Sequence, residues 1–280
     1  MPNASPASPA SPDVLRQQVG ELLRRWRERA GISVETAVSE TALSAPSLWR
    51  WEAGTLPRKP KTDTIEALLR LYGAADDEIA AILDLAEKAA ARPWWHPYRF
   101  QLPGWVQASI AYAESSTMIR IYAPHRIPDL LQTPGYAQAR GCDEVGLSLL
   151  ARRQAVLHRA TPERPRLWVI LDESIFCRSV SGDPEVLCEQ IDHLIYLTSR
   201  RRFTLQIVPL TTTGQPAAEP FTIYRLAPQE LPDVVCREVL DGGQFTDDRD
   251  SVGVYRVAWD AYARALSPMD SLALLKSIHA

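Results

Sequence analysis

The sequence predicts a mainly α N-terminal domain of about five short helices, followed by an α+β domain with a small sheet of about four strands. Apolar residues recur at helical spacing from Val14 to about residue 91. The segment "PWWHPYRFQLPGW", rich in proline and aromatic residues, then ends this pattern. Beyond it, helix-like segments mix with short runs of β-branched and aromatic residues. A length of 280 residues is also typical of about two domains.

Residues 1–12 consist of Met-Pro-Asn followed by three Ala-Ser-Pro triplets. Such a low-complexity segment cannot bury enough apolar surface to fold, so we expect a disordered tail. The sequence therefore predicts a tail at 1–12, a helical domain at 13–75, a connector helix at 76–93 and an α+β domain at 94–280.

Helix signals follow one another closely in the N-terminal part. The first helix buries a face that includes Leu15 and Trp26, and Gly31 ends it. Ser33 and Ser44 stand where N-caps of the next two helices are expected. The predicted helices run over 14–30, 33–40, 44–52, 62–72 and 76–91.

The C-terminal part mixes helix and strand patterns. Strands are expected at 167–171, 203–208, 221–226 and 234–239. Helices are expected at about 104–122, 134–141, 145–160, 184–201, 247–265 and 268–278. Asp183-Pro184 and Ser267-Pro268 each pair an N-cap residue with a proline at the first helical position. The stretch Asp241–Gln244, "DGGQ", is expected to be a turn.

Charge is distributed unevenly along the chain, whose formal net charge is -3. Residues 13–73 carry 10 Lys and Arg against 8 Asp and Glu, and the remainder carries 21 against 26. A mildly basic N-terminal part and an acidic remainder fit a small DNA-facing domain on a larger body.

Cysteine usage and hydropathy point to a cytoplasmic protein. The four cysteines are widely separated and form no C-x-x-C pair, so we expect reduced thiols and no metal site. The sequence contains no apolar run of about 20 residues and no secretory signal, so we expect no membrane association.

The closely spaced second and third helices predict a helix-turn-helix. Leu48 and Trp51 fall on the buried side of the third helix. Ser44, Ser47 and Arg50 recur every three residues on its exposed side. Arg50 can make a bidentate contact to guanine, whereas the serines can bind phosphates. The candidate DNA-binding residues are Val34, Ser44, Pro46, Ser47, Trp49, Arg50, Arg58, Lys59 and Lys61.

Two of these residues carry open interpretations. Trp49 could contact a sugar or a thymine methyl group, or pack against the connector or the C-terminal domain. Pro46 fits the start of a helix without strain, but it removes an N–H donor that could have bound phosphate.

The segment Leu22–Pro57 resembles the helix-turn-helix of XRE-type, phage-repressor-like regulators. It contains Leu-Arg-x-x-Arg-x-x-x-Gly-Ile-Ser and ends in Trp-Glu-x-Gly-x-x-Pro. The resemblance implies a base contact at Arg50 and a phosphate or base contact at the first residue of the second helix. There the family favours glutamine and this chain has Val34, while Ala45 and Pro46 stand where polar residues are common.

The segment Trp105–Ala139 resembles the start of the antitoxin-like C-terminal domain, of unknown function, in actinobacterial XRE-type regulators. The matching core is Ile-Pro-x-Leu-Leu-Gln-Thr-x-x-Tyr-Ala, with Asp129 in place of the usual glycine. "RRQAVL", "VPLTTTGQPAAEPFTIYRL" and "ALSPMDSLALLKSI" also resemble this family, and Cys236 stands where an aromatic residue is common. The resemblance implies two partners, an operator DNA and a small protein encoded beside such regulators.

Aromatic and acidic residues of the C-terminal part are candidates for a ligand pocket. The aromatic residues could line such a pocket or close a domain interface. Glu114 could serve as an acid or pair with an arginine, and the strand-end carboxylates could act as general acids or bases. The candidates are Trp94, Trp95, Tyr98, Glu114, Gln132, Tyr136, Trp168, Glu173 and Glu238.

Three functions follow as alternatives. The first is a dimeric DNA-binding transcription regulator whose C-terminal domain senses a small molecule or a small partner protein. The second is a helix-turn-helix protein recruited as a small-molecule binder or biosynthetic enzyme. The third is an antitoxin-like partner that works through protein contact. The sequence carries no nucleophile-elbow, metal or Gly-rich phosphate motif, so we assign no catalytic residue, metal or cofactor.

Overall fold

The computed structural model describes residues 11–54, 56–57, 61–90, 93–159, 164–177, 180, 182–200, 203–212, 219–226, 231–264 and 266–279. The tail expected at 1–12 lies outside them, apart from its last two residues. The chain forms two compact units, one of residues 1–115 with 226–232 and the other of residues 116–225 with 233–280. The sequence places the boundary near residue 93. Residues 94–115 group with the first unit, in which α6 (Gly104–Ser115) packs against the first helix.

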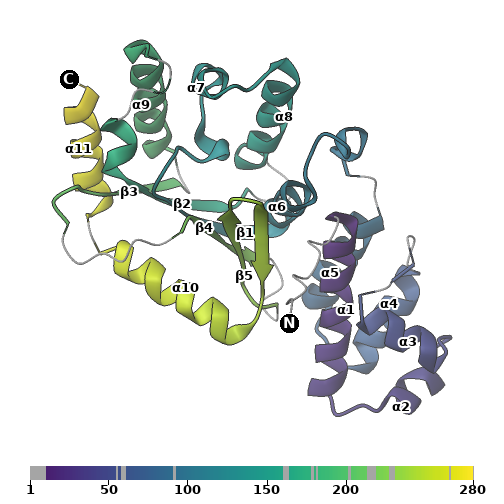
Figure 1. The fold of residues 1–280 in the computed structure, drawn as a ribbon. Coiled ribbons are helices and arrows are strands. Elements are labelled where there is room, and N and C mark those ends of the chain that lie inside the picture. The colour runs from purple at the N-terminus through teal and green to yellow at the C-terminus, as the bar shows by residue number, and fades with distance from the viewer. Residues whose placement is uncertain are drawn as a thin grey trace, which may run out of the picture. The chain divides into compact units, whose positions relative to one another are not determined.

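The N-terminal unit is helical, as predicted. Its first five helices are α1 (Ser11–Arg29), α2 (Val34–Ser39), α3 (Ala45–Glu52), α4 (Thr62–Leu71) and α5 (Asp76–Ala90) (Figure 1). The short 3-10 helix η1 (His96–Tyr98) and α6 follow. Helix α1 packs against α3, α4, α5 and α6, and Val19, Leu22 and Leu23 are fully buried in this core. Burial of this apolar face supplies most of the stability of such short helices.

The close approach of α1 to the end of α3 depends on two glycines. A Cβ atom at Gly20 would lie 2.2 Å from the carbonyl oxygen of Trp51, and one at Gly54 would lie 2.7 Å from Cγ of Gln17. Gly54 also has a φ of 80°, a left-handed conformation that favours glycine at the end of a helix. The Gly of the Trp-Glu-x-Gly motif is therefore required both by backbone conformation and by packing.

A buried ion pair fixes the same junction. Arg27, near the end of α1, donates from Nε to Oε1 of Glu52 at 2.7 Å and from Nη2 to Oε2 at 2.8 Å. The side chains are only 14% and 6% exposed. Hydrogen bonding to Glu52 raises the pKa of Arg27. Arg27 also donates to the carbonyl oxygen of Ile32, so one guanidinium joins α1, the turn before α2 and the last residue of α3.

The C-terminal unit contains one mixed sheet, in which the described residues form six strands rather than the four expected. Their order is β3-β2-β1-β4-β5-β6. Strands β1, β2 and β3 are parallel to one another. Strand β5 is antiparallel to both of its neighbours, β4 and β6. The strands are β1 (Ser116–Ala123), β2 (Arg166–Asp172), β3 (Phe203–Val208), β4 (Phe221–Leu226), β5 (Val234–Val239) and β6 (Gly242–Thr246).

Strand β1 corrects the prediction of a helix over 104–122. Helix α6 ends at Ser115, and the next residue begins the strand. The apolar residues of this stretch fit a helix as well as a strand in sequence. Pairing with β2 on one side and β4 on the other decides the outcome, and it explains why β1 has buried residues on both faces.

Strand β6 corrects the prediction of a turn at Asp241–Gln244. The turn consists of Leu240 and Asp241 alone, and Val239 pairs with Gly242 across it. Glycine has a low preference for strands, so the sequence gives little signal here. The backbone ladder with β5 supplies the stabilisation instead.

Helices cover both faces of the sheet. Figure 1 shows α10 (Arg249–Tyr262) on one face, and α7 (Pro134–Ala139), α8 (Glu144–Gln154) and α9 (Pro184–Thr198) on the other. Trp259 and Tyr262 of α10 pack against a core that includes Tyr122 of β1, whose ring stacks on Tyr262 at 4.0 Å between centroids. Helix α11 (Pro268–His279) packs against β3 and α9. The remaining short helices are η2 (Asp129–Leu131), η3 (Ala155–Leu157) and η4 (Glu173–Cys177).

Glu52→Gln tests the junction between α1 and α3. We expect it to lower the free energy of opening of α3 by about 2–4 kcal/mol, because it leaves Arg27 without its buried counter-charge. Native-state hydrogen exchange of the α3 amides in the full chain measures this. Glu66→Gln is the control, since Glu66 forms an exposed pair with Arg70 and its loss should change the opening of α3 little. Equal losses in the two variants would contradict a special role for Glu52.

Candidate functional site

The exposed side of α3 carries a row of polar side chains. Ser44, the N-cap residue, donates its hydroxyl to Oγ of Ser47 at 2.9 Å, and Arg50 donates from Nη2 to the same oxygen at 3.3 Å. Ser44 and Arg50 are exposed. The three residues lie one turn apart, as expected from their spacing. The row therefore presents two hydroxyls and one cation along a single line of the helix.

The opposite side of α3 is buried, as its sequence predicts. Leu48 is fully buried and Trp51 nearly so. Trp49 is 58% exposed, so most of its indole ring is accessible. Pro46 is also exposed and lies in the first turn, where a missing N–H breaks no helical hydrogen bond. The indole ring of Trp49 is thus an apolar surface beside the polar row.

The remaining candidate DNA-binding residues lie on either side of α3 in the sequence. Val34 is the partly buried first residue of α2, and Ser33 caps that helix by accepting from N of Thr36 at 3.1 Å. Lys61 is exposed immediately before α4. Arg58 and Lys59 lie outside the described residues.

Four of the candidate pocket residues belong to the N-terminal unit. Trp94 donates from Nε1 to Oε1 of Glu114 at 2.7 Å, and its ring meets that of Trp95 edge to face. Trp95 is buried against Ile110 of α6. Tyr98 ends η1 and is partly buried. The contacts of Trp94, Trp95 and Glu114 attach the aromatic segment to α6.

Two further candidates make hydrogen bonds between the β2 and β3 segments of the chain. Trp168 of β2 donates from Nε1 to Oε1 of Gln206 at 2.7 Å, and its ring meets Trp259 edge to face. Glu173, just after β2, accepts from N of Leu210 at 2.7 Å. These bonds hold β3 beside β2.

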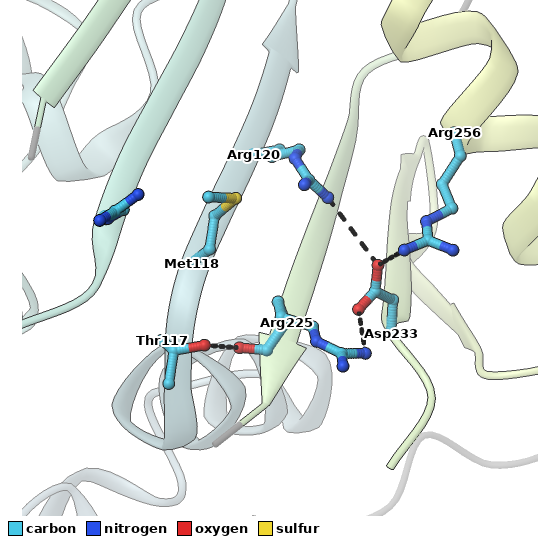
Figure 2. A pocket seen from close by; sticks show the side chains of 7 residues that line it. Thr117, Met118, Arg120, Arg225, Asp233 and Arg256 are labelled. Atoms are coloured by element: carbon cyan, nitrogen blue, oxygen red, sulfur yellow. Dashed lines mark hydrogen bonds and ion pairs between the residues drawn. The ribbon is translucent and has the colours of Figure 1, made fainter. Parts of the chain in front are cut away.

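A polar cavity of about 500 Å³ lies on the α10 face of the sheet, at the ends of β1 and β2 where Met118 pairs with Arg166. Arg120 lies two residues before Tyr122 on β1, and Tyr122 is a member of the core beneath α10, so both side chains point to that face. Figure 2 shows Arg120, Arg225 and Arg256 directed toward the carboxylate of Asp233. The lining residues are Thr117, Met118, Arg120, Arg166, Arg225, Asp233 and Arg256.

None of these lining residues was among the candidates from the sequence. The available signal was a set of arginines inside apolar strand runs, such as Arg120 in "MIRIYA" and Arg225 in "FTIYRL". A charged residue within a buried strand usually has a partner or a function. Assignment of 104–122 to a helix concealed that signal for Arg120.

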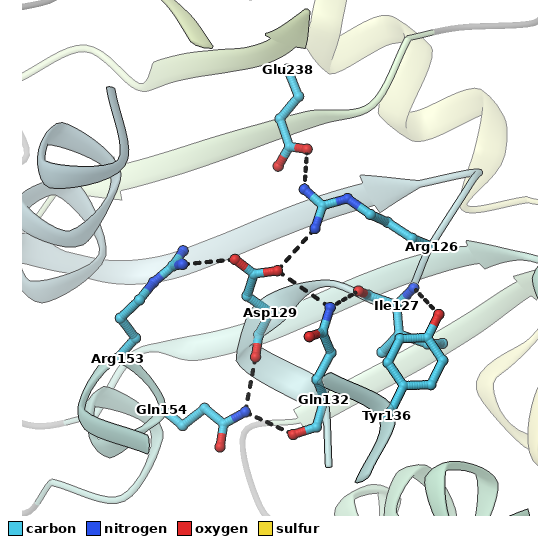
Figure 3. A network of polar contacts seen from close by, with 8 residues as sticks. All are labelled: Arg126, Ile127, Asp129, Gln132, Tyr136, Arg153, Gln154 and Glu238. Carbon is cyan, nitrogen blue, oxygen red and sulfur yellow. Dashed lines mark hydrogen bonds and ion pairs between the residues drawn. The ribbon is translucent and has the colours of Figure 1, made fainter. Parts of the chain in front are cut away.

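A second polar cluster surrounds Asp129, on the segment that follows β1 (Figure 3). Arg126 donates from Nη1 to Oδ1 of Asp129 at 2.9 Å, and Arg153 of α8 donates from Nη1 to Oδ2 at 2.7 Å. Arg126 also pairs with Glu238 of β5. Burial disfavours the charged form of Asp129, but Arg153 and Arg126 outweigh that effect, and the pKa of Asp129 is lowered.

Amide groups complete this cluster. Gln132 donates to the carbonyl oxygen of Ile127 at 2.8 Å, and Gln154 donates to the carbonyl oxygens of Asp129 and Gln132, both at 2.9 Å. The hydroxyl of Tyr136 accepts from N of Ile127 at 3.4 Å. The structure thus brings together the candidates Gln132, Tyr136 and Glu238, in contacts that tie η2 to α8 and β5.

Within the described ranges, no group of three or more His, Cys, Asp or Glu side chains is arranged to hold a metal ion. Nor does any helix in those ranges have the length and apolar character needed to cross a membrane.

Asp129→Asn tests the ionic character of the second cluster. The pKa of Asp129 is lowered on folding, so its stabilisation is present above the unfolded pKa of about 3.9 and is lost as pH falls through the folded value. We therefore expect the variant to unfold about 1–2 kcal/mol more easily at neutral pH, and the difference to shrink below about pH 4.

Urea unfolding of the full chain across this pH range measures the effect. Asp241→Asn, on the exposed turn between β5 and β6, is the control and should change stability little at any pH. A pH-independent difference for Asp129→Asn would show that the negative charge of Asp129 does not stabilise this cluster.

Comparison with known families identifies both parts of the chain. A helix-turn-helix domain family matches residues 18–82, which include α2, α3 and α4. The family described as Domain of unknown function (DUF5753) matches residues 106–277. Comparisons with curated proteins and with solved structures found no match. Because the second match covers more than half of the chain, the protein belongs to the DUF5753 family and carries an N-terminal helix-turn-helix domain.

Proposed function

We propose that the protein is a DNA-binding transcription regulator of the XRE type that uses α3 as its recognition helix. The observation that carries this proposal is the exposed row of Ser44, Ser47 and Arg50 on a helix that α1 holds from behind. A helix in this setting can enter the major groove, because the side chains near its N-terminus are short. The match of this segment to a helix-turn-helix family supports the proposal.

The side chains of this row, Ser44, Ser47 and Arg50, are suited to different parts of the DNA. Arg50 can donate two hydrogen bonds to O6 and N7 of guanine, which is the commonest specific contact in the major groove. Ser44 and Ser47 are suited to phosphate oxygens, which fix the register of the protein on the duplex. The exposed ring of Trp49 offers an apolar surface for a thymine methyl group or a sugar.

Neighbouring positions limit how much sequence such a helix can read. Ala45 and Pro46 have no side-chain donor or acceptor, and Val34 at the start of α2 has none either. Direct readout therefore depends mainly on Arg50. We expect a short core of specified bases, with additional affinity from cations such as Lys61.

The C-terminal domain supplies the remaining functions in this proposal. A single short recognition helix gives a small interface, so we propose a homodimer that places two copies of α3 in successive major grooves, about 34–36 Å apart. The C-terminal domain would hold the dimer together and receive a regulatory signal from a small molecule or a small protein. We propose that the regulator works in the cytoplasm, beside the DNA that it controls.

Arg50→Ala tests the base contact. After the preferred site is selected from random duplexes by the native chain, we expect the variant to bind it about 5- to 150-fold more weakly, which corresponds to about 1–3 kcal/mol. Fluorescence anisotropy with the labelled site measures the affinity. The preference for guanine at one position should also relax.

Arg70→Ala is the matched control, because it removes the same charge from α4, where Arg70 pairs with Glu66 and Asp76. It should change the affinity for the selected site little. Undiminished binding by Arg50→Ala, or equal losses in the two variants, would exclude the role given to Arg50. Failure of the native chain to select any site would exclude sequence-specific DNA binding.

Lys61→Ala tests a phosphate contact. We expect it to weaken binding to specific and non-specific duplexes alike, and to reduce the slope of log K against log salt by about 0.9. Anisotropy titrations over a series of salt concentrations measure the slope. Lys88→Ala, which removes a cation paired with Asp84 on α5, should leave the slope unchanged. An unchanged slope in Lys61→Ala would show that Lys61 does not contact DNA.

A further inference from the structure

The cavity on the α10 face of the sheet gathers cations from four separate elements. Arg120 comes from β1, Arg166 from β2, Arg225 from β4 and Arg256 from α10. The acidic residue among the side chains that line this cavity is Asp233. Four positive charges therefore share one lining carboxylate, in a domain whose overall charge is negative.

The carboxylate of Asp233 is an internal counter-ion for three of these arginines. It lies 3.1 Å from Nη1 of Arg225, 3.3 Å from Nη2 of Arg256 and 3.8 Å from Nη1 of Arg120. Its side chain is only 1% exposed. Oδ2 is buried and makes no hydrogen bond of good geometry within the described part of the chain. Oδ1 of Asp233 accepts a hydrogen bond from Arg225, and Oδ2 lies near Arg256 and Arg120, so the carboxylate gathers three guanidinium groups in one place.

The side chain of Arg120 is only 23% exposed, so little water solvates its charge. Burial lowers the pKa of its guanidinium and outweighs the opposing attraction of Asp233 and Asp260, and the nearby charges of Arg256 and Arg225 lower it further. An arginine keeps its proton at any physiological pH. An anion bound in the cavity would therefore replace part of the hydration that the charged guanidinium loses on burial.

We propose that this cavity is an anion site that binds a small molecule through a phosphate or diphosphate group, contacted by Arg120, Arg166 and Arg256. The inference relies on the proposed regulatory function only for its biological purpose, since the binding itself requires no DNA. Arg120 and Arg256 are already oriented by Asp233, so little ordering is needed when the anion binds.

The shape of the cluster favours a phosphate over a carboxylate. A carboxylate presents two oxygens in one plane and suits a single guanidinium. A phosphate presents oxygens in several directions, which matches a cavity lined by arginines from β1, β2, β4 and α10, of which Figure 2 labels Arg120, Arg225 and Arg256. The volume of about 500 Å³ lies within the range of small-molecule pockets, and Met118 provides an apolar contact in its wall.

Isothermal titration of the full chain with inorganic pyrophosphate, at constant ionic strength and without DNA, tests the proposal. We expect saturable binding of one pyrophosphate per chain, with weaker binding of citrate, which carries comparable charge on carboxylates. Arg166→Gln and Arg256→Gln should each weaken pyrophosphate binding about tenfold. Arg166 is exposed and Arg256 is 56% exposed, so neither change should prevent folding.

Two controls separate this site from other sources of affinity. Arg140→Gln removes an exposed arginine of the same domain that does not line the cavity, and it should leave pyrophosphate binding unchanged. Arg50→Ala should also leave it unchanged, so failure of DNA binding and failure of the anion site are distinguishable.

Several results would overturn the proposal. These are the absence of saturable pyrophosphate binding, equal binding of citrate, or equal weakening by Arg140→Gln. If pyrophosphate does not bind but Arg166→Gln and Arg256→Gln both weaken binding to non-specific duplex DNA, the cluster contacts the DNA backbone instead. That result would overturn the proposal of a small-molecule site as well.

Discussion

The buried ion pair between Arg27 and Glu52 is the interaction on which the proposed DNA contact depends. It joins the end of α1 to the end of α3 through two parallel hydrogen bonds, at a point where Gly20 and Gly54 let the backbones approach closely. A charge pair of this kind is costly to break, because the partner that remains is left buried. The orientation of α3, and with it the direction of Arg50, follows from this junction.

The C-terminal domain depends on β1 in a comparable way. This strand lies at the centre of the sheet, parallel to β2 and next to β4. On the α10 face it supplies Arg120 to the arginine-lined cavity described above (the arginine cavity) and Tyr122 to the apolar core. Beyond its end, the chain enters the cluster around Asp129. One strand therefore positions both polar clusters of the domain.

The two polar clusters differ in how their charges are balanced. Around Asp129, carboxylates and arginines alternate, and amide groups of Gln132 and Gln154 satisfy nearby carbonyl oxygens. Such a network is suited to holding η2 and α8 in place. Around Asp233, arginines outnumber the lining carboxylate. An excess of oriented donors beside a cavity is the arrangement expected of an anion-binding site, which is why we assign ligand binding to this cluster alone.

The sequence by itself determined the helical N-terminal part, the buried and exposed sides of α3, and four of the strands in the sheet. These features rest on local signals such as the cap at Ser33, the N-cap position of Ser44 and the spacing of Ser47 and Arg50. Only the tertiary structure decided that 116–123 is a strand and that the glycines of β6 join a ladder, because pairing partners distant in sequence supply the hydrogen bonds. It also decided the arginine cavity, since residues from β1, β2, β4 and α10 meet there only after the sheet has formed.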